Sequence, residues 1–172
     1  MAFISVPERE VLEVIELDDE DPSGYIAGLL KDTKTKIQFS TALSDFYKYA
    51  DIQNSFIAIA KKGIPVDLLL DVDVDWETKR KELETIFNAF TGDKLTVKQS
   101  KEKIPHWLII DDGNHIRIEK EHKNGKDVIR TSNAILYHTK NEKDEAVIFL
   151  VKNINDNFND WWKDAEPMTV TK

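Results

Sequence analysis

The chain has 172 residues and a mass of 19.9 kDa, the size of a single domain with a core of its own. Hydrophobic residues make up 41% of it and charged residues 33%, a composition typical of soluble globular proteins rather than of disordered chains. The absence of cysteine excludes a disulfide scaffold, a cysteine-ligated metal site and a cysteine nucleophile. A net charge of -8 argues against a protein whose whole surface binds polyanions.

No segment has the composition of a membrane anchor or an export signal. The longest apolar run, residues 146–151, is far shorter than the roughly 20 residues that a membrane-spanning helix needs, and it indicates a buried element. The first residues, 1–7, lack the basic start and the hydrophobic length of an export signal. We therefore expect a cytoplasmic protein with no membrane partner.

The N-terminal residues 8–21 form an acidic segment, with eight acidic residues and a single base, Arg9. Apolar residues alternate with glutamate inside it, which predicts a short strand at a sheet edge whose charges discourage further pairing. Asp21 and Pro22 are typical of the cap and the first position of a helix. That helix continues, at helical spacing, through Ile26, Leu29 and Leu30.

Strands and helices then alternate along the chain. Residues 36–41 predict a core strand, and Asp51 is expected to cap a second helix that ends at Gly63. Residues 65–70 predict a strand buried on both faces, as parallel sheets require. A third, single helix follows on Lys79, Leu83, Ile86, Phe87 and Phe90, before a short strand at residues 95–98.

From Pro105 onwards the pattern is typical of hairpins. Strands at residues 106–111 and 115–120 flank a turn at 112–114. Asn124 with Gly125 marks a second hairpin turn, which leads into strands at 127–132 and 134–138. A long amphipathic helix closes the chain on Val147, Leu150, Val151, Ile154, Phe158 and Trp161. We therefore predict an α/β fold with a mixed, largely parallel sheet flanked by helices.

Two groups of polar residues invite comparison with metal sites. The first is the alternating series Asp71, Asp73 and Asp75, and the second is a strand face with His115, Arg117 and Glu119. The aspartates lack the glycine and the distal glutamate of a calcium loop, so a solvated connection in which Asp75 caps the next helix is the better interpretation. On the strand, Arg117 is the natural charge partner of Glu119. We expect neither a metal ion nor another cofactor.

Residues 94–130 are the most basic region of this acidic chain, with nine basic and six acidic residues. A platform for single-stranded nucleic acid combines basic groups with several aromatic rings, and Trp107 is the only aromatic residue here. The region therefore leaves nucleic acid as an alternative partner without favouring it.

Three segments, taken in order, resemble one repeat of the phospholipase D-like superfamily. They are a helix and strand over residues 52–70, a buried strand opened by His106 and ending in an acidic turn over 105–113, and a strand opened by Asn133 before the long final helix. Together they span about residues 22 to 162. The resemblance implies an acidic N-terminal segment at 1–21, a phospholipase D-like domain at 22–165 and a frayed tail at 166–172.

The superfamily signature is His-x-Lys followed by Asp, with Asn downstream, and two such repeats face each other in one chain or in a homodimer. By resemblance, His106 takes the nucleophile position and Asn133 the downstream position. Leu108 occupies the lysine position, and Asp111 and Asp112 come earlier than the family spacing requires. Loss of the cationic group removes on the order of several kcal/mol of transition-state stabilisation in phosphoryl transfer.

The resemblance therefore predicts a degenerate, non-catalytic binding or regulatory module that pairs as a symmetric homodimer. Its cleft near His106, Ser132 and Asn133 is expected to bind a phosphorylated or sugar-like small molecule, or another protein. One alternative is a small phosphodiesterase or nuclease in which His106 acts with Lys103 as the substitute cation. The other is a nucleic-acid-associated accessory protein that contacts phosphates through Lys98, Lys101 and Lys103.

Overall fold

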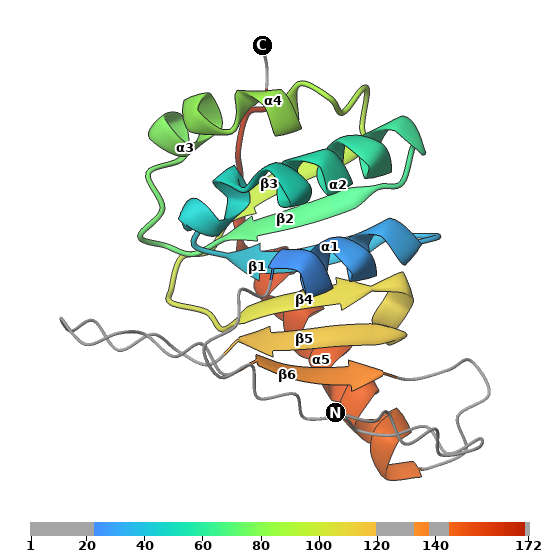
Figure 1. Ribbon diagram of the computed structural model, residues 1–172. Helices are drawn as coiled ribbons and strands as arrows, with labels where there is room; N and C mark the ends of the chain where they lie inside the picture. The colour runs from blue at the N-terminus through green and yellow to red at the C-terminus, as the bar shows by residue number, and fades with distance from the viewer. Residues whose placement is uncertain (1–22, 120–132, 138–144, 171–172) are drawn as a thin grey trace, which may run out of the picture.

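In a computed structural model, which describes residues 23–119, 133–137 and 145–170, the chain forms one sheet with helices on both faces (Figure 1). The strands are β1 (Ile37–Thr41), β2 (Val66–Leu70), β3 (Leu95–Gln99), β4 (His106–Ile110), β5 (His115–Glu119), β6 (Asn133–Tyr137) and β7 (Glu166–Pro167). The helices are α1 (Ser23–Asp32), α2 (Ala50–Lys61), α3 (Trp76–Glu82), α4 (Glu84–Phe87) and α5 (Glu145–Asp164), with short 3-10 turns η1 (Asp45–Lys48) and η2 (Asp111–Gly113).

The strand order across the described sheet is β6-β5-β4-β1-β2-β3-β7. The neighbours β1, β2 and β3 are parallel, because α2 and then α3 with α4 cross over between them. The hairpin strands β4, β5 and β6 add antiparallel pairs beside β1. The predicted mixed α/β class is therefore confirmed. The sheet is not largely parallel, however, because among the described strands two pairs are parallel and four, including β3 with β7, are antiparallel.

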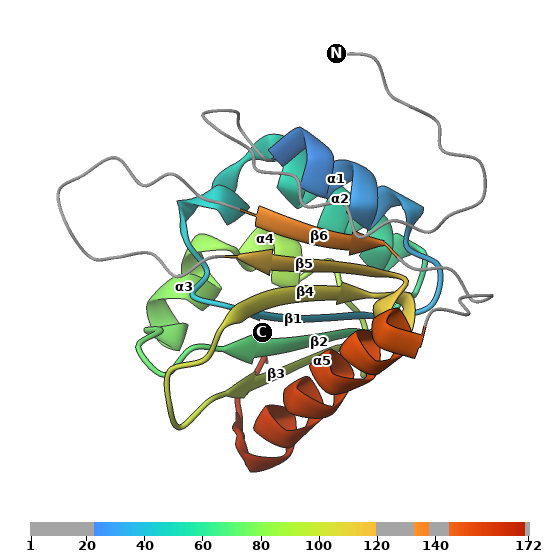
Figure 2. The ribbon, with the colours of Figure 1, turned by 90° about the horizontal axis from the view of Figure 1, so that it is seen from below.

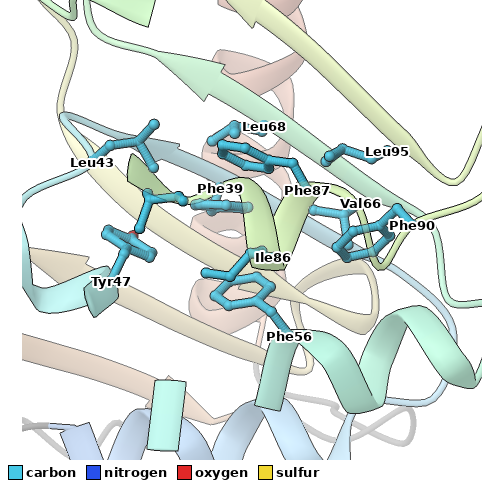
Figure 3. A pocket seen from close by; sticks show the side chains of 11 residues that line it. Phe39, Leu43, Tyr47, Phe56, Val66, Leu68, Ile86, Phe87, Phe90 and Leu95 are labelled. Carbon is cyan, nitrogen blue, oxygen red and sulfur yellow. The ribbon is translucent and has the colours of Figure 1, made fainter. Parts of the chain in front are cut away.

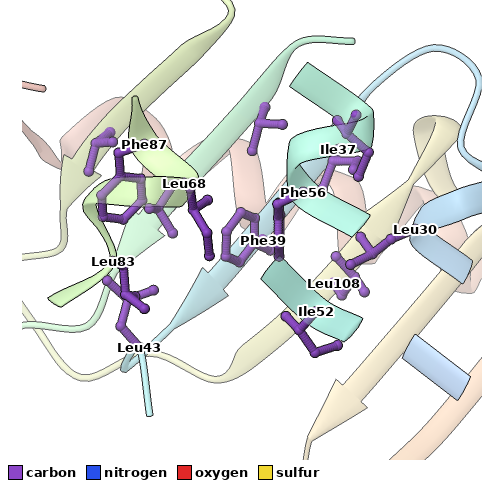
Figure 4. Packing of buried hydrophobic residues seen from close by; sticks show 14 of the residues in the cluster. Leu30, Ile37, Phe39, Leu43, Ile52, Phe56, Leu68, Leu83, Phe87 and Leu108 are labelled. Carbon is purple, nitrogen blue, oxygen red and sulfur yellow. The ribbon is translucent and has the colours of Figure 1, made fainter. Parts of the chain in front are cut away.

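Helices α1 and α2 cover one face of the sheet and α5 covers the other (Figure 2). The first face carries a core whose residues include Leu30, Ile37, Phe39, Ile52, Phe56 and Leu68 (Figure 4). The core under α5 contains Leu69, Ile109, Ile116, Val151, Ile154 and Phe158. Burial of each such side chain stabilises the fold by roughly 1.5–3 kcal/mol, and β4 contributes to both cores through Leu108 and Ile109.

Two predictions about helices are wrong. Asp51 lies in the first turn of α2, and the capping position belongs to Tyr49, which makes no side-chain cap. The predicted third helix breaks at Leu83, whose backbone (φ -113, ψ 21) separates α3 from α4. Leu83 is 2% exposed, so the break lets its side chain reach the core together with those of α4. None of the helices in the described part of the chain is long and apolar enough to cross a membrane.

The C-terminal residues also differ from the prediction, which expected a frayed tail at 166–172. Residues 166–170 are not frayed, because β7 pairs with the end of β3 and the amide of Met168 donates to the carbonyl of Val97. The indole nitrogen of Trp76 also donates to the carbonyl of Thr169 at 3.1 Å. Met168 and Val170 pack against the core, and this apolar contact holds the C-terminal segment in place.

Several predicted features lie outside the described residues. They are the strand within residues 8–21, the cap at Asp21 and Pro22, the turn at Asn124 and Gly125, and the strand at 127–132. The first hairpin is confirmed as β4, η2 and β5, and the strand predicted at 134–138 is β6.

Candidate functional site

The candidate site lies at one end of the strands, where His106 is the first residue of β4. Because β4 is antiparallel to β5, the register pairs His106 with Glu119, the last residue of β5. The next pairing places Asn133, the first residue of β6, opposite Glu119. The fold therefore brings His106 and Asn133 into one row across three neighbouring strands. Ser132 lies outside the described residues.

A carboxylate faces each nitrogen of the His106 ring. The Nε2 atom lies 3.3 Å from Oδ2 of Asp71, and the Nδ1 atom lies 3.9 Å from Oε2 of Glu119. The Asp71 side chain is 4% exposed and that of His106 is 20% exposed. The histidine is thus a largely buried strand residue whose orientation is fixed by acidic groups.

Asp71 reaches His106 because the loop after β2 is held in place. The side-chain amide of Gln99 donates to the carbonyls of Asp71, Val72 and Val74 at 3.3, 3.2 and 2.9 Å. The amide of Val72 donates to Oδ1 of Asp71 at 2.7 Å, which leaves Oδ2 directed at the imidazole. Sequence patterns did not identify Asp71 as a site residue, because its role depends on the contact with β4.

The three alternating aspartates have three different partners. Asp71 faces His106, while Asp73 forms an exposed ion pair with Lys103 at 2.8 Å. Asp75 caps α3 as predicted, since its Oδ1 accepts from the amide of Thr78 at 3.2 Å. The three therefore do not converge on one point, and the charge of Lys103 is directed at Asp73.

The guanidinium of Arg117 belongs to the residue paired with Leu108 across the β4–β5 hairpin. Leu108 is 7% exposed and belongs to the core beneath α1 and α2. The register places Arg117 directly opposite Leu108, so the two side chains share one face of the sheet. The Nη2 atom of Arg117 lies 3.5 Å from the same Oε2 of Glu119 that faces His106.

The sequence left open whether another basic residue replaces the missing lysine, and Arg117 is a basic residue on the same face as Leu108. The predicted Arg117–Glu119 pair is confirmed, and it adds a charge to the site that the reading of single strands had missed. The Arg117 side chain is 10% exposed, and Oε2 of Glu119 lies 3.5 Å from its Nη2 and 3.9 Å from Nδ1 of His106. The negative charge of Glu119 therefore offsets the positive charge of Arg117 close to His106.

A small hollow lies between this face of the sheet and helices α1 and α2. Its polar residues are Ser40, Tyr47, Arg117 and Glu119, and its other lining residues are Ile26, Leu30, Phe39, Phe56, Trp107 and Leu108. Burial raises the pKa of Tyr47 to about 12, against the hydrogen bond with Thr41 and the charge of Arg117, which lower it. The phenol therefore stays protonated at neutral pH. Tyr47 belongs to η1, a loop segment that carried no sequence signal.

A second hollow lies under α2 and α4 (Figure 3). Its lining includes Phe39, Leu68, Phe87 and Phe90, which are members of the main core. Figure 3 shows these rings and aliphatic chains directed toward one another. Because it offers almost no polar group to orient a ligand, this hollow is part of the core.

Asp111 lies at the opposite end of β4 from His106 and has a structural role. Its carboxylate accepts hydrogen bonds from the amides of Lys34, Thr35 and Lys36 and from the hydroxyl of Thr35. Burial opposes ionisation, but these donors outweigh it and lower the pKa of Asp111. Asp111 and Asp112 both have positive φ values of 50 and 60, so the carboxylate anchors a turn in the left-handed region.

His115 lies at this same end, since it opens β5 while Glu119 closes it. Burial lowers the pKa of His115, and Asp111 and Asp32 oppose that change. His115 and Glu119 are therefore at opposite ends of one strand and do not form a pair of metal ligands. Among the residues that the structure describes, no three histidines or carboxylates lie close enough to hold a metal ion together.

Neither a protein-family model nor a curated protein matches the sequence. Solved structures do. TrmBL2, described as an archaeal chromatin protein with a novel mode of DNA binding, superposes with a TM-score of 0.66 and 16% identity over 96% of this chain and 57% of its own. Nuc from Salmonella typhimurium, a phospholipase D family member, gives 0.56 and 13% identity over 84% and 89% of the two chains. Phosphatidylserine synthase from Haemophilus influenzae gives 0.51 and 12%, over 83% and 36%.

These likenesses show the phospholipase D-like fold, as the three sequence segments predicted. At such identities they show the fold alone. The chain spans only 57% of the length of TrmBL2.

The contacts of Asp111 predict an acid-dependent contribution to stability. Asparagine tolerates the left-handed backbone as well as aspartate does, so Asp111→Asn removes mainly the charge. We expect a loss of about 1 kcal/mol in the free energy of unfolding at neutral pH. Because the folded-state pKa is lowered, this contribution is fully present above the unfolded value of about 3.9 and disappears as pH falls through the folded value. Urea unfolding of wild type and Asp111→Asn across this pH range measures the difference in the free energy of unfolding. A difference that stays constant down to the lowest pH contradicts the prediction.

Proposed function

We propose that the chain is a non-catalytic binding module of phospholipase D-like fold, whose ligand occupies the cleft around His106. The observation that carries this proposal is the position of Glu119, whose Oε2 lies 3.9 Å from the imidazole and 3.5 Å from the guanidinium of Arg117. The carboxylate occupies the place between histidine and cation where a phosphoryl group would have to lie.

The charges around His106 disfavour phosphoryl transfer. A phosphoryl group needs positive charge on its equatorial oxygens, whereas the two ring nitrogens here face Asp71 and Glu119. Two like charges 4 Å apart repel by roughly 4 kcal/mol at the effective dielectric constant near a protein surface. One guanidinium that already pairs with Glu119 does not offset two carboxylates.

The same groups suit an uncharged, hydroxyl-bearing ligand such as a sugar-like molecule. Carboxylate oxygens accept hydrogen bonds from hydroxyls, while Arg117 and the protonated Tyr47 can donate them. The register places the backbone of Asn133 opposite Glu119, on the neighbouring strand. Between the two ligand chemistries that the resemblance suggested, the charges favour the sugar-like one.

The proposal predicts that a generic phosphodiester is not hydrolysed. With bis(p-nitrophenyl) phosphate as substrate, we expect wild type and His106→Ala to release p-nitrophenol at the rate of buffer alone, because the cation needed for transfer is neutralised. Turnover by the wild type that His106→Ala abolishes would instead establish the phosphodiesterase alternative.

Removal of the intervening carboxylate should create an anion site. In Glu119→Gln, the carboxylate shared by Arg117 and His106 is gone and Asp71 still faces the other ring nitrogen, so we expect inorganic phosphate to bind at least about tenfold more tightly, or roughly 1.4 kcal/mol. Isothermal titration calorimetry measures this gain. Glu102→Gln, an exposed residue outside the cleft, is the matched control with the same change in net charge. Equal phosphate affinity in wild type and Glu119→Gln contradicts the proposed role of Glu119.

A nucleic-acid-binding role is the second candidate, and the likeness to TrmBL2 over 96% of this chain favours it. The contacts of the lysines weaken it. The ammonium of Lys98 donates to the carbonyl of Trp162 at 2.8 Å and lies 4.9 Å from its ring centre, and Lys103 pairs with Asp73. Two of the three lysines proposed as phosphate contacts therefore have partners within the chain.

This second candidate requires DNA affinity that falls steeply as salt concentration rises. It also requires that neutralising Lys98, Lys101 and Lys103 by glutamine weakens binding more than neutralising Lys61 and Lys163, which are exposed elsewhere. Fluorescence anisotropy of a short labelled duplex across a salt series measures both effects. Absent or salt-independent binding removes the candidate.

A further inference from the structure

The hollow lined by Tyr47, Arg117 and Glu119 is too small for the ligand that the proposed function assigns to it. Its volume is about 10 Å³, which is room for about one water molecule. A sugar ring is several times larger than a water molecule. Such a ligand therefore reaches these polar groups only if one of the elements around the hollow moves.

Most walls of the hollow are firmly held. Strands β1, β4 and β5 lie inside the sheet, and each pairs with a neighbour on both sides. Tyr47 of η1 packs against the rings of Phe39 and Phe56, with ring centres 6.1 and 6.2 Å apart. Helix α2 spans twelve residues and buries Ile52, Phe56 and Ile59. Movement of any of these walls would break the main core of the protein.

Helix α1 is held by fewer buried side chains than α2. It has ten residues, and the buried side chains among those that the structure describes in it are Ile26 and Leu30, which line the hollow. Leu30 belongs to the same core cluster as Leu108 on β4 (Figure 4), and Ala27 and Leu29 are partly buried against it. Helices this short are marginal in water without tertiary contacts, so the closed position of α1 depends on these few side chains.

Two glycines lower the stability of α1. Gly24 and Gly28 lie one turn apart at exposed positions, and a Cβ at either would meet nothing within 4 Å beyond its chain neighbours and the helix backbone. Packing does not require glycine there, yet each glycine disfavours the helix about fivefold relative to alanine. At the other end of α1, the ammonium of Lys62 donates to the carbonyl of Lys31 at 2.8 Å. The half of α1 that contains the glycines is therefore the part that unfolds most easily.

We propose that α1 is a lid on this hollow, which opens by local unfolding of the helix while the sheet and α2 remain folded. Opening removes Ile26 and Leu30 from the lining and uncovers Arg117 and Glu119 for a ligand of sugar-like size. The inference rests on the proposed function for the identity of that ligand. The opening itself needs no ligand, so the lid and the proposed function fail in separate experiments.

The test uses a single introduced thiol, because the chain has no cysteine. Leu108→Cys places the thiol in the lining of the hollow, and Ile109→Cys, the next residue of β4, places it in the core under α5. Iodoacetamide is the entering molecule, and mass spectrometry follows its addition under native conditions. We expect Leu108→Cys to react at least about tenfold faster than Ile109→Cys, since unfolding of α1 exposes only residue 108. Urea unfolding of each variant gives the rate expected from global unfolding alone.

Two alanine substitutions in the Leu108→Cys background identify the element that opens. Gly28→Ala is expected to slow the reaction at least about threefold, because alanine stabilises the closed helix. Asn54→Ala, the matched control, favours helix at an exposed position of α2 and should leave the rate unchanged.

Equal rates for Leu108→Cys and Ile109→Cys, or rates no faster than global unfolding, overturn the proposal. So does a rate that Gly28→Ala leaves unchanged, or that Asn54→Ala slows equally. Should a thiol variant fail to fold, amide hydrogen exchange of the unmodified chain decides. We expect the amide of Leu30 in α1 to exchange at least about tenfold faster than that of Ile59 in α2, and equal protection contradicts the lid.

Discussion

One oxygen atom, Oε2 of Glu119, faces both the imidazole of His106 and the guanidinium of Arg117. Through this atom the site has the parts of a phosphoryl-binding centre without the charge distribution that such a centre needs. The histidine is oriented by carboxylates and a cation is present, but under the proposed function Glu119 occupies the place that an anionic ligand would need. For the proposed function, the identity of residue 108 matters less than the Glu119 carboxylate that faces both His106 and Arg117.

This contact depends on the register of the β4–β5 hairpin. Pairing of His106 with Glu119 and of Leu108 with Arg117 puts all four side chains on one face, and a slip of one residue would turn the β5 pair to the other face. The hairpin turn at η2 fixes this register from the far end. Asp111 binds three amides of the loop before β1, and Gly113 provides the space into which Val151 of α5 packs.

The sequence predicts much of the fold because its apolar periodicities are strong. The α/β class, the hairpin, and the long final helix follow from local patterns, and the row of His106 and Asn133 follows from the order of motifs. Local patterns could not predict contacts between elements. Asp71 reads as a solvated loop residue, Tyr47 lies in a short turn, and Arg117 reaches the cleft only through pairing across strands. Likewise, the apolar run at 146–151 reads as buried, whereas Phe149 within it is 65% exposed, because exposure depends on how α5 lies against the sheet.

A crystal structure grown from phosphate tests the central claim most directly. The account predicts that the Glu119 carboxylate remains between His106 and Arg117 and that no anion occupies this cleft. A phosphate held jointly by the imidazole and the guanidinium, with Glu119 displaced from between them, would contradict it.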